Sequence, residues 1–236
     1  MYDLFILFFY QPLLNLLIFI YNSLPGHDLG IAIVVLTIVV KALLFPLSWK
    51  QIKAQAEMQK MQPLIAELKE KHKDDKQALM QAQVALFKEH NVNPLASCLP
   101  LLIQLPFLIA LFYVFQNGIQ AKDLNLLYSF VANPGTLNHT FLGWFSVTQN
   151  HNIVIAVITG ALQFIQTKMM MPAMPKPQKG KEEEFATIMN KQMLYMMPVL
   201  TGFISYQFPS GLGLYWSVQT LLGIAQQLFF FKKKSA

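Results

Sequence analysis

A single lysine inside a long apolar segment is the residue whose chemistry most needs an explanation in this 236-residue chain. Lys41 lies about 12 residues into the segment 29–49, which places it about 18 Å along a helix. A lysine near the middle of a bilayer costs on the order of 3 kcal/mol, so such residues usually face a bundle interior or a water-filled cavity. A long lysine side chain can instead snorkel towards the inner interface, and this alternative stays open.

Polar residues recur at helical spacing around Lys41 and on the other apolar segments. Thr37 and Ser48 stand at i−4 and i+7 of Lys41, on the same helical face. No Asp or Glu occurs in the five apolar segments, and an unpaired cation needs water or a visiting anion, so we predict a hydrated cavity. Interhelical hydrogen bonds, worth about 0.6 kcal/mol each, are the simpler explanation for several stripes. The predicted groove residues are Lys41, Thr37, Gln104, Gln163, Thr201, Ser205, Tyr215, Trp216 and Gln219.

The elements that must position these residues are membrane-spanning helices. Hydrophobic residues make up 54% of the chain and charged residues only 13%, with a mean hydropathy of +0.40, whereas soluble domains carry about a quarter charged residues. A span needs about 20 residues of helix to cross a core of roughly 30 Å. The predicted fold is therefore an all-α polytopic five-helix bundle with a polar groove. Its spans are 29–49, 94–117, 152–171, 192–208 and 212–231.

Lysine placement predicts the orientation of these spans. The segment 50–93 holds eight lysines, the segment from 168 to 191 holds five, and the tail after Phe231 holds three. If five spans alternate, these sixteen lie on one side and only Lys122 lies on the other. Lysine-rich loops stay in the cytoplasm, so we expect the N-terminus outside and the C-terminus in the cytoplasm of a bacterial cell membrane.

The N-terminal residues 1–28 contain a further apolar stretch, 4–21, whose role is less direct. Gln11, Pro12 and Asn15 interrupt it, and Gln11, Asn15 and Asn22 share one helical face. This pattern favours a helix that lies in the outer interface. A sixth span is the alternative, because about 18 apolar residues approach the length of a crossing. Residues 118–151 form the predicted outer segment.

The segment 50–93 is predicted to be a cytoplasmic helical hairpin. Its first arm runs from about residue 51 to 72, and Lys73–Asp75 supplies the turn and an N-cap for the second arm. Its charges suit a solvated face, and a docking surface for a partner is the more specific interpretation. Residues 172–191, with three prolines, are a predicted cytoplasmic loop, and 232–236 are a short basic tail.

Several kinds of chemistry are excluded by the residues present. The one cysteine, Cys98, rules out an internal disulfide, and the five histidines have no metal-ligand spacing. No Ser/His/Asp set or phosphate-cradling loop is found. All eighteen basic residues are lysines, and the topology rule explains their placement without nucleic acid. We expect no enzyme activity, no metal, no cofactor and no nucleic-acid binding.

Five stretches of sequence carry a resemblance to a known family. They are QPLLNLLIFIYN, IVVKALLFPLSWKQ, MQPLIAELKEKHKDDKQ, NVNPLASCLPLLIQLPFLIALF and FPSGLGLYW. Together they resemble the outer interfacial helix, first core span, cytoplasmic hairpin arm and later spans of the YidC/Oxa/Alb membrane protein insertases. The match runs from about Gln11 to Lys232. Family members commonly have arginine at the place of Lys41, so the planar fork of a guanidinium is missing here.

The resemblance implies a membrane insertase and chaperone that receives nascent membrane proteins. Their polar tails would enter a groove open to the cytoplasm and the lipid bilayer, while apolar segments slide out into lipid. Lys41 would be the groove cation with Thr37 beside it, and Trp216 would match an aromatic position where the substrate emerges. The ribosome, the signal recognition particle receptor and the Sec translocon are the further partners implied, although the short tail weakens the case for the ribosome.

Two other functions stay open from the residues alone. A small anion transporter or channel could use Lys41 to bind its solute, but no span contains an acidic proton relay or an inverted pair of broken helices. A scaffold without a groove could use the hairpin only to dock partners.

Overall fold

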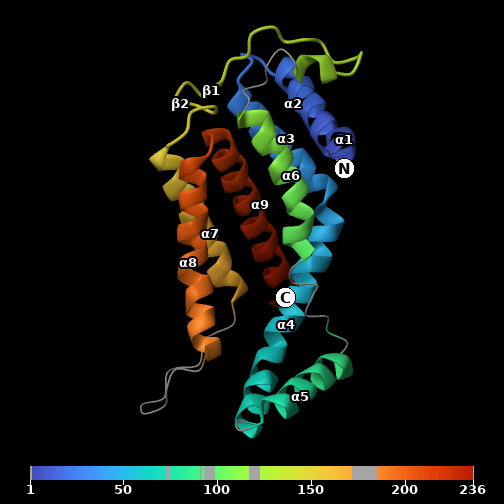
Figure 1. The fold of residues 1–236 in the computed structure, drawn as a ribbon, viewed down its shortest axis with the longest axis vertical. Coiled ribbons are helices and arrows are strands. Elements are labelled where there is room, and N and C mark those ends of the chain that lie inside the picture. Colours follow the sequence, from blue (N-terminus) through green and yellow to red (C-terminus); the bar gives the residue numbers. More distant parts are fainter. Residues whose placement is uncertain are drawn as a thin grey trace.

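The computed structural model describes residues 2–72, 75–90, 92, 99–116, 123–171 and 185–235, and most of these residues are helical. Five helices, α3, α6, α7, α8 and α9, run along the long axis, and α4 and α5 project from one end (Figure 1). We call that end the hairpin end and the opposite end, which carries β1 and β2, the loop end. The all-α prediction is confirmed. The elements are α1 (Tyr2–Phe5), η1 (Ile6–Tyr10), α2 (Gln11–Ser23), α3 (Leu29–Leu43), α4 (Phe45–Lys71), α5 (Lys76–Glu89), α6 (Leu99–Gln116), η3 (Asp123–Leu126), β1 (Thr140–Phe141), β2 (Phe145–Ser146), α7 (Ile153–Met170), α8 (Phe185–Gln207) and α9 (Ser210–Ser235).

The predicted span 29–49 contains parts of two helices that meet at an angle. α3 ends at Leu43, and the pair Leu29–Leu43 and Phe45–Leu68 is bent by 68°. Pro46 lies in the first turn of α4, where its missing N–H costs nothing but where it interrupts the hydrogen bonds of a continuous helix. The break places Lys41 in the last turn of α3, next to carbonyl groups that favour a positive charge.

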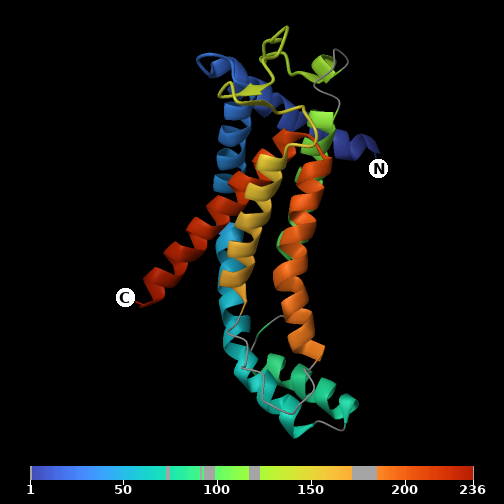
Figure 2. The same ribbon diagram turned by 90° about the vertical axis from the view of Figure 1, so that its left-hand side faces the viewer.

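The N-terminal helix, formed by α1, η1 and α2, runs obliquely across the loop end (Figure 2). Its polar face contacts protein. The Asn15 side chain, 2% exposed, donates to the Leu126 carbonyl at 2.9 Å and accepts from the Tyr128 N–H at 2.6 Å. Asn22 donates to the Ala132 carbonyl at 2.7 Å. These contacts provide hydrogen-bond partners for backbone groups at and after the end of η3. That this helix lies in the membrane interface stays a prediction.

An apolar core fills the loop end of the bundle. Leu14 and Leu17 of α2, Leu36 of α3, Leu111 of α6 and Leu212 of α9 all belong to one buried cluster. The connection between α8 and α9 is short, because α8 ends at Gln207 and α9 begins at Ser210. The core therefore occupies the space between these helices at the loop end, and a polar cavity is left nearer the hairpin end.

Length and hydropathy alone identify only some of the spans. Among the described residues, Asp3–Ser23 and Ile153–Met170 are long and apolar enough to cross a membrane, and the bent α3–α4 pair adds a third. α8 and α9 are long but carry polar side chains, which the next section places around a cavity. Spans that enclose a polar space need not be apolar on every face.

The hairpin of α4 and α5 follows the local sequence signals. Asp75 caps α5, accepting hydrogen bonds from the N–H groups of Gln77 and Ala78 at 2.9 Å, as the sequence predicted. Lys73 and Asp74 lie outside the described residues, as do residues 172–184 of the expected loop and Lys122. α8 already begins at Phe185, so the end of that expected loop is helical, and α9 continues through the basic tail to Ser235.

Candidate functional site

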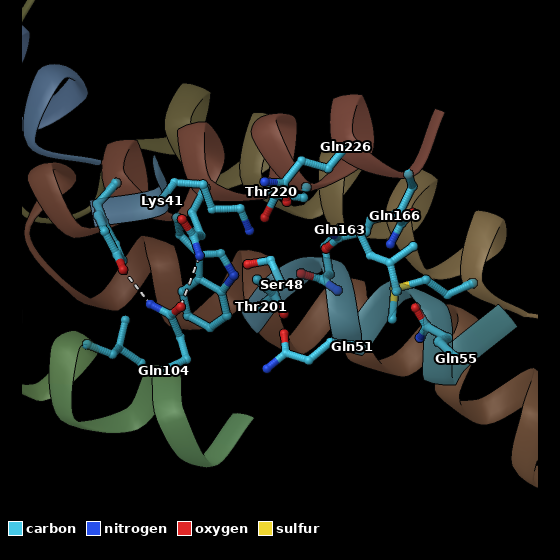
Figure 3. Close-up of a pocket in the computed structure, with 18 of the residues that line it drawn as sticks. Lys41, Ser48, Gln51, Gln55, Gln104, Gln163, Gln166, Thr201, Thr220 and Gln226 are labelled. Atoms are coloured by element: carbon cyan, nitrogen blue, oxygen red, sulfur yellow. Dashed lines mark hydrogen bonds between the residues drawn. The ribbon is translucent and has the colours of Figure 1, made fainter. Parts of the chain in front are cut away.

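A cavity of about 370 Å³ lies among the helices, and one water molecule needs only about 10–15 Å³ of such volume. It extends from Tyr215, beside the apolar core, to Gln55 and Met170 at the hairpin end. Side chains from α3, α4, α7, α8 and α9 surround it, and Gln104 reaches it from α6 (Figure 3). Seven of the nine predicted groove residues line it: Lys41, Gln104, Gln163, Thr201, Tyr215, Trp216 and Gln219.

The other two predicted residues, Thr37 and Ser205, are buried and do not line the cavity. The Thr37 hydroxyl donates to the Ile33 carbonyl of its own helix at 2.6 Å. The Ser205 hydroxyl lies 3.3 Å from that of Thr159, which is 2.8 Å from that of Ser217. This small network joins α7, α8 and α9, so interhelical hydrogen bonding explains Ser205.

The Lys41 ammonium group faces α9 across the cavity. Gly223 of α9 lies nearby: a Cβ placed there would lie 4.0 Å from Lys41 Nζ and would clash with Gln166 Nε2. Within the described part of the chain, no residue forms an ion pair or hydrogen bond with Lys41. The carbonyl groups in the C-terminal turn of α3 partly stabilise its positive charge, an effect of typically 0.3–1 kcal/mol. The charge is therefore available to a ligand that enters the cavity.

A chain of hydrogen bonds fixes part of the wall between α6 and α9. The Gln104 Nε2 group donates to the Tyr215 hydroxyl, and the Gln219 Nε2 group donates to Gln104 Oε1 at 3.0 Å. Tyr215 is 2% exposed, so this chain begins in the apolar core and ends in the cavity. These bonds leave Gln219 Oε1 buried and without a donor among the described residues.

Several residues that line the cavity were not among the groove residues predicted from the sequence. Ser48, Gln51 and Gln55 of α4 line the cavity, although the two glutamines were placed on the hairpin arm. The missed signal was their spacing of i, i+3 and i+7, which puts all three on one helical face. Four more lining residues belong to polar stripes of α7 and α9: Gln166, Thr220, Gln226 and Gln227.

This fold and this site define a multi-pass helical membrane protein whose bundle encloses a polar cavity with one lysine. The chain belongs to the 60Kd inner membrane protein family, whose sequence model matches residues 19–236. The resemblance drawn from its motifs is thereby confirmed.

Three similar proteins show which members of this family the chain resembles. It is 36% identical over 228 residues to the membrane protein insertase YidC of Fusobacterium nucleatum, covering 96% of this chain and 98% of that protein. It is 35% identical to the YidC of Pelobacter propionicus, where 94% of this chain matches 38% of the relative. A crystal structure described as an active YidC insertase with its first transmembrane domain resolved superposes with a TM-score of 0.55 and 25% identity, covering 95% of this chain and 44% of that one. The chain thus spans nearly all of one relative and less than half of the others.

Proposed function

We propose that this protein is a membrane protein insertase and chaperone, which moves hydrophobic segments of nascent proteins into the bilayer without breaking covalent bonds. The observation that carries the proposal is the cavity: it is lined by polar side chains from several spans and holds one lysine with no partner among the described residues. Membership of a family whose relatives are named insertases supports the same function.

The cavity lowers the cost of moving a polar tail across the membrane. Polar backbone groups in hydrocarbon each cost several kcal/mol when unsatisfied, so water and hydrogen-bonding side chains along part of the path reduce the barrier. In this mechanism Lys41 attracts acidic residues of the arriving tail. A membrane potential that is negative inside then draws those anions outward, at about 2.3 kcal/mol per charge per 100 mV.

The proposal includes an orientation and a set of partners. The lysine-rich segments face the cytoplasm of a bacterial cell, with the N-terminus outside and the C-terminus inside, because sixteen of the eighteen lysines then lie on the cytoplasmic side. Nascent membrane proteins and lipid contact the cavity. The ribosome, the signal recognition particle receptor and the Sec translocon are partners proposed by family resemblance.

Complementation tests this function directly. Cells depleted of their own insertase are given this chain, and insertion of a small single-span protein with an acidic tail is followed by protease protection. We expect rescue by the wild-type chain and by Lys53→Ala, a control at an exposed lysine of α4. Lys41→Ala should insert the acidic-tail substrate more slowly. Normal membrane expression without rescue would refute the proposal, and anion flux through purified protein in liposomes would favour a transporter instead.

A further inference from the structure

Glutamine is the dominant polar residue of the cavity wall. Eight of the twenty lining residues are glutamines, whereas the described lining contains one lysine and no carboxylate. Four of them, Gln166 of α7 and Gln219, Gln226 and Gln227 of α9, surround the space beside Lys41; we call these four the glutamine array. A wall built mainly to attract charge would carry more cations, so the array needs a different explanation.

Three members of the array have acceptor atoms without partners. The Oε1 atoms of Gln219, Gln226 and Gln227 are buried and accept no hydrogen bond within the described part of the chain. Gln227 is only 5% exposed, although it lines the cavity. A buried acceptor without a donor costs about 1–3 kcal/mol, which a ligand that supplies donors would recover when the carboxamide rotates its oxygen into the cavity. The array therefore suits a ligand rich in N–H groups.

The chemistry of the carboxamide indicates more specifically which class of ligand the array binds. Each glutamine side chain has an N–H donor group and a carbonyl acceptor, so it can pair with both the C=O and the N–H of a peptide unit. Lysine offers only donors and a carboxylate only acceptors, so neither can serve both groups of a backbone. An extended chain has one N–H and one C=O per residue that need partners away from water. Carboxamides match those groups whatever the side chains of the ligand are.

The spacing of the array fits an extended chain. Gln219 and Gln227 are eight positions apart on α9, which corresponds to about 12 Å along the helix. An extended polypeptide rises about 3.3 Å per residue, so this length matches three to four residues. Gly223 lies between them, and its missing side chain leaves the Gln166 amide room against α9.

We propose that the glutamine array binds the backbone of an extended, uncharged segment of the inserting chain, so that the cavity accepts tails that carry no acidic residue. The inference rests on the proposed insertase function and adds a substrate class to it. Lys41 selects acidic tails by charge, and the array holds neutral tails by their peptide groups. The two recognition modes act at neighbouring positions of one cavity and are separable by mutation.

Backbone esters in the substrate test this proposal without altering the protein. The purified full-length chain is placed in liposomes and supplied with synthetic single-span peptides that have a neutral Gly/Ser tail. In a second peptide, three successive tail amides are replaced by esters, which removes three N–H donors. Insertion is measured as protease protection of the tail. We expect about a threefold loss for each hydrogen bond the tail can no longer form. In protein-free liposomes the ester tail should cross at least as readily as the amide tail, because it has fewer donors to desolvate.

Variants of the array provide the second arm of the experiment. Gln226→Leu and Gln227→Leu should each slow the neutral amide tail about threefold, and the double variant should distinguish ester from amide less than the wild type does, because two of the three unpartnered acceptors are gone. Gln207→Leu, at an exposed position of α8, is the matched control. If the wild-type protein inserts both tails equally well, the backbone-binding inference is overturned while the insertase function stands. If it inserts no peptide of any tail, including an acidic one, the proposed function itself fails.

Discussion

Lys41→Met should remove the preference of this protein for acidic tails while leaving its cavity intact. Methionine keeps an unbranched side chain that is only one atom shorter, and it removes the charge. The ammonium group of Lys41 faces the cavity beside Gly223 and has no ion-pair partner among the described residues. Its loss therefore breaks no ion pair or hydrogen bond among the described residues, and the main consequence falls on the substrate.

The size of the effect follows from the geometry. A tail carboxylate that approaches to 4 Å gains about 1 kcal/mol in bulk water and about 4 kcal/mol at an effective dielectric constant of 20. A cavity that holds water lies towards the lower value, and every 1.4 kcal/mol is about tenfold in rate. We expect acidic-tail insertion to fall about tenfold in Lys41→Met, and neutral-tail insertion to fall much less.

The assay compares insertion rates of two substrates that differ only in one tail aspartate, with Lys53→Met as the charge-matched control on the exposed face of α4. Lys41→Arg should keep the preference, because the charge is retained. Lys41→Glu should fail most severely on acidic tails and should recover when the tail aspartate is replaced by lysine. Equal losses on acidic and neutral tails would show that Lys41 acts on the structure and not on the substrate, and would refute the reasoning.

Three further predictions concern the frame around the cavity. Gly202→Ala should destabilise the crossing of α7 and α8 by about 1–3 kcal/mol, because its Cβ would lie 3.1 Å from the Ala156 carbonyl oxygen; unfolding in detergent measures this. Gln59→Leu should loosen the hairpin, because Gln59 Nε2 donates to the Met170 carbonyl at the end of α7 at 2.6 Å; amide exchange in α4 should rise about fivefold, and an unchanged rate would contradict the contact. Burial lowers the pKa of His139 below 6.5, so the folded state binds protons less readily; stability should be complete above about pH 6.5 and fall below it, and His139→Phe should abolish that pH dependence.

Much of the helical framework follows from local sequence. Long apolar runs predicted the spanning helices, and an asparagine or aspartate marks the start of three helices: Asp28 caps α3, Asp75 caps α5 and Asn152 caps α7. These signals are readable because a cap depends only on residues within one helical turn. Of these three caps, only that of α5 was predicted from the sequence.

The residues that line the cavity were harder to predict from the sequence than the helices were. Lys41, Gln104 and Gln163 could be selected as polar residues in apolar helices, and they do line the cavity. Thr37 satisfied the same criterion but donates to its own helix, and Gln51 was missed because it lies beyond the predicted span 29–49. Helical spacing shows which residues share a face, but it does not show what that face contacts.

The sequence by itself determined that this chain is a helical membrane protein with one lysine inside an apolar segment and an uneven distribution of the other lysines. Those features depend on composition and on the length of apolar runs, which are local properties. The tertiary structure decided the surroundings of Lys41. The bend after Leu43 places it in the last turn of α3, and the missing side chain of Gly223 leaves room for the nearby Gln166 amide. Such surroundings depend on how distant helices cross, which no single segment of the sequence contains.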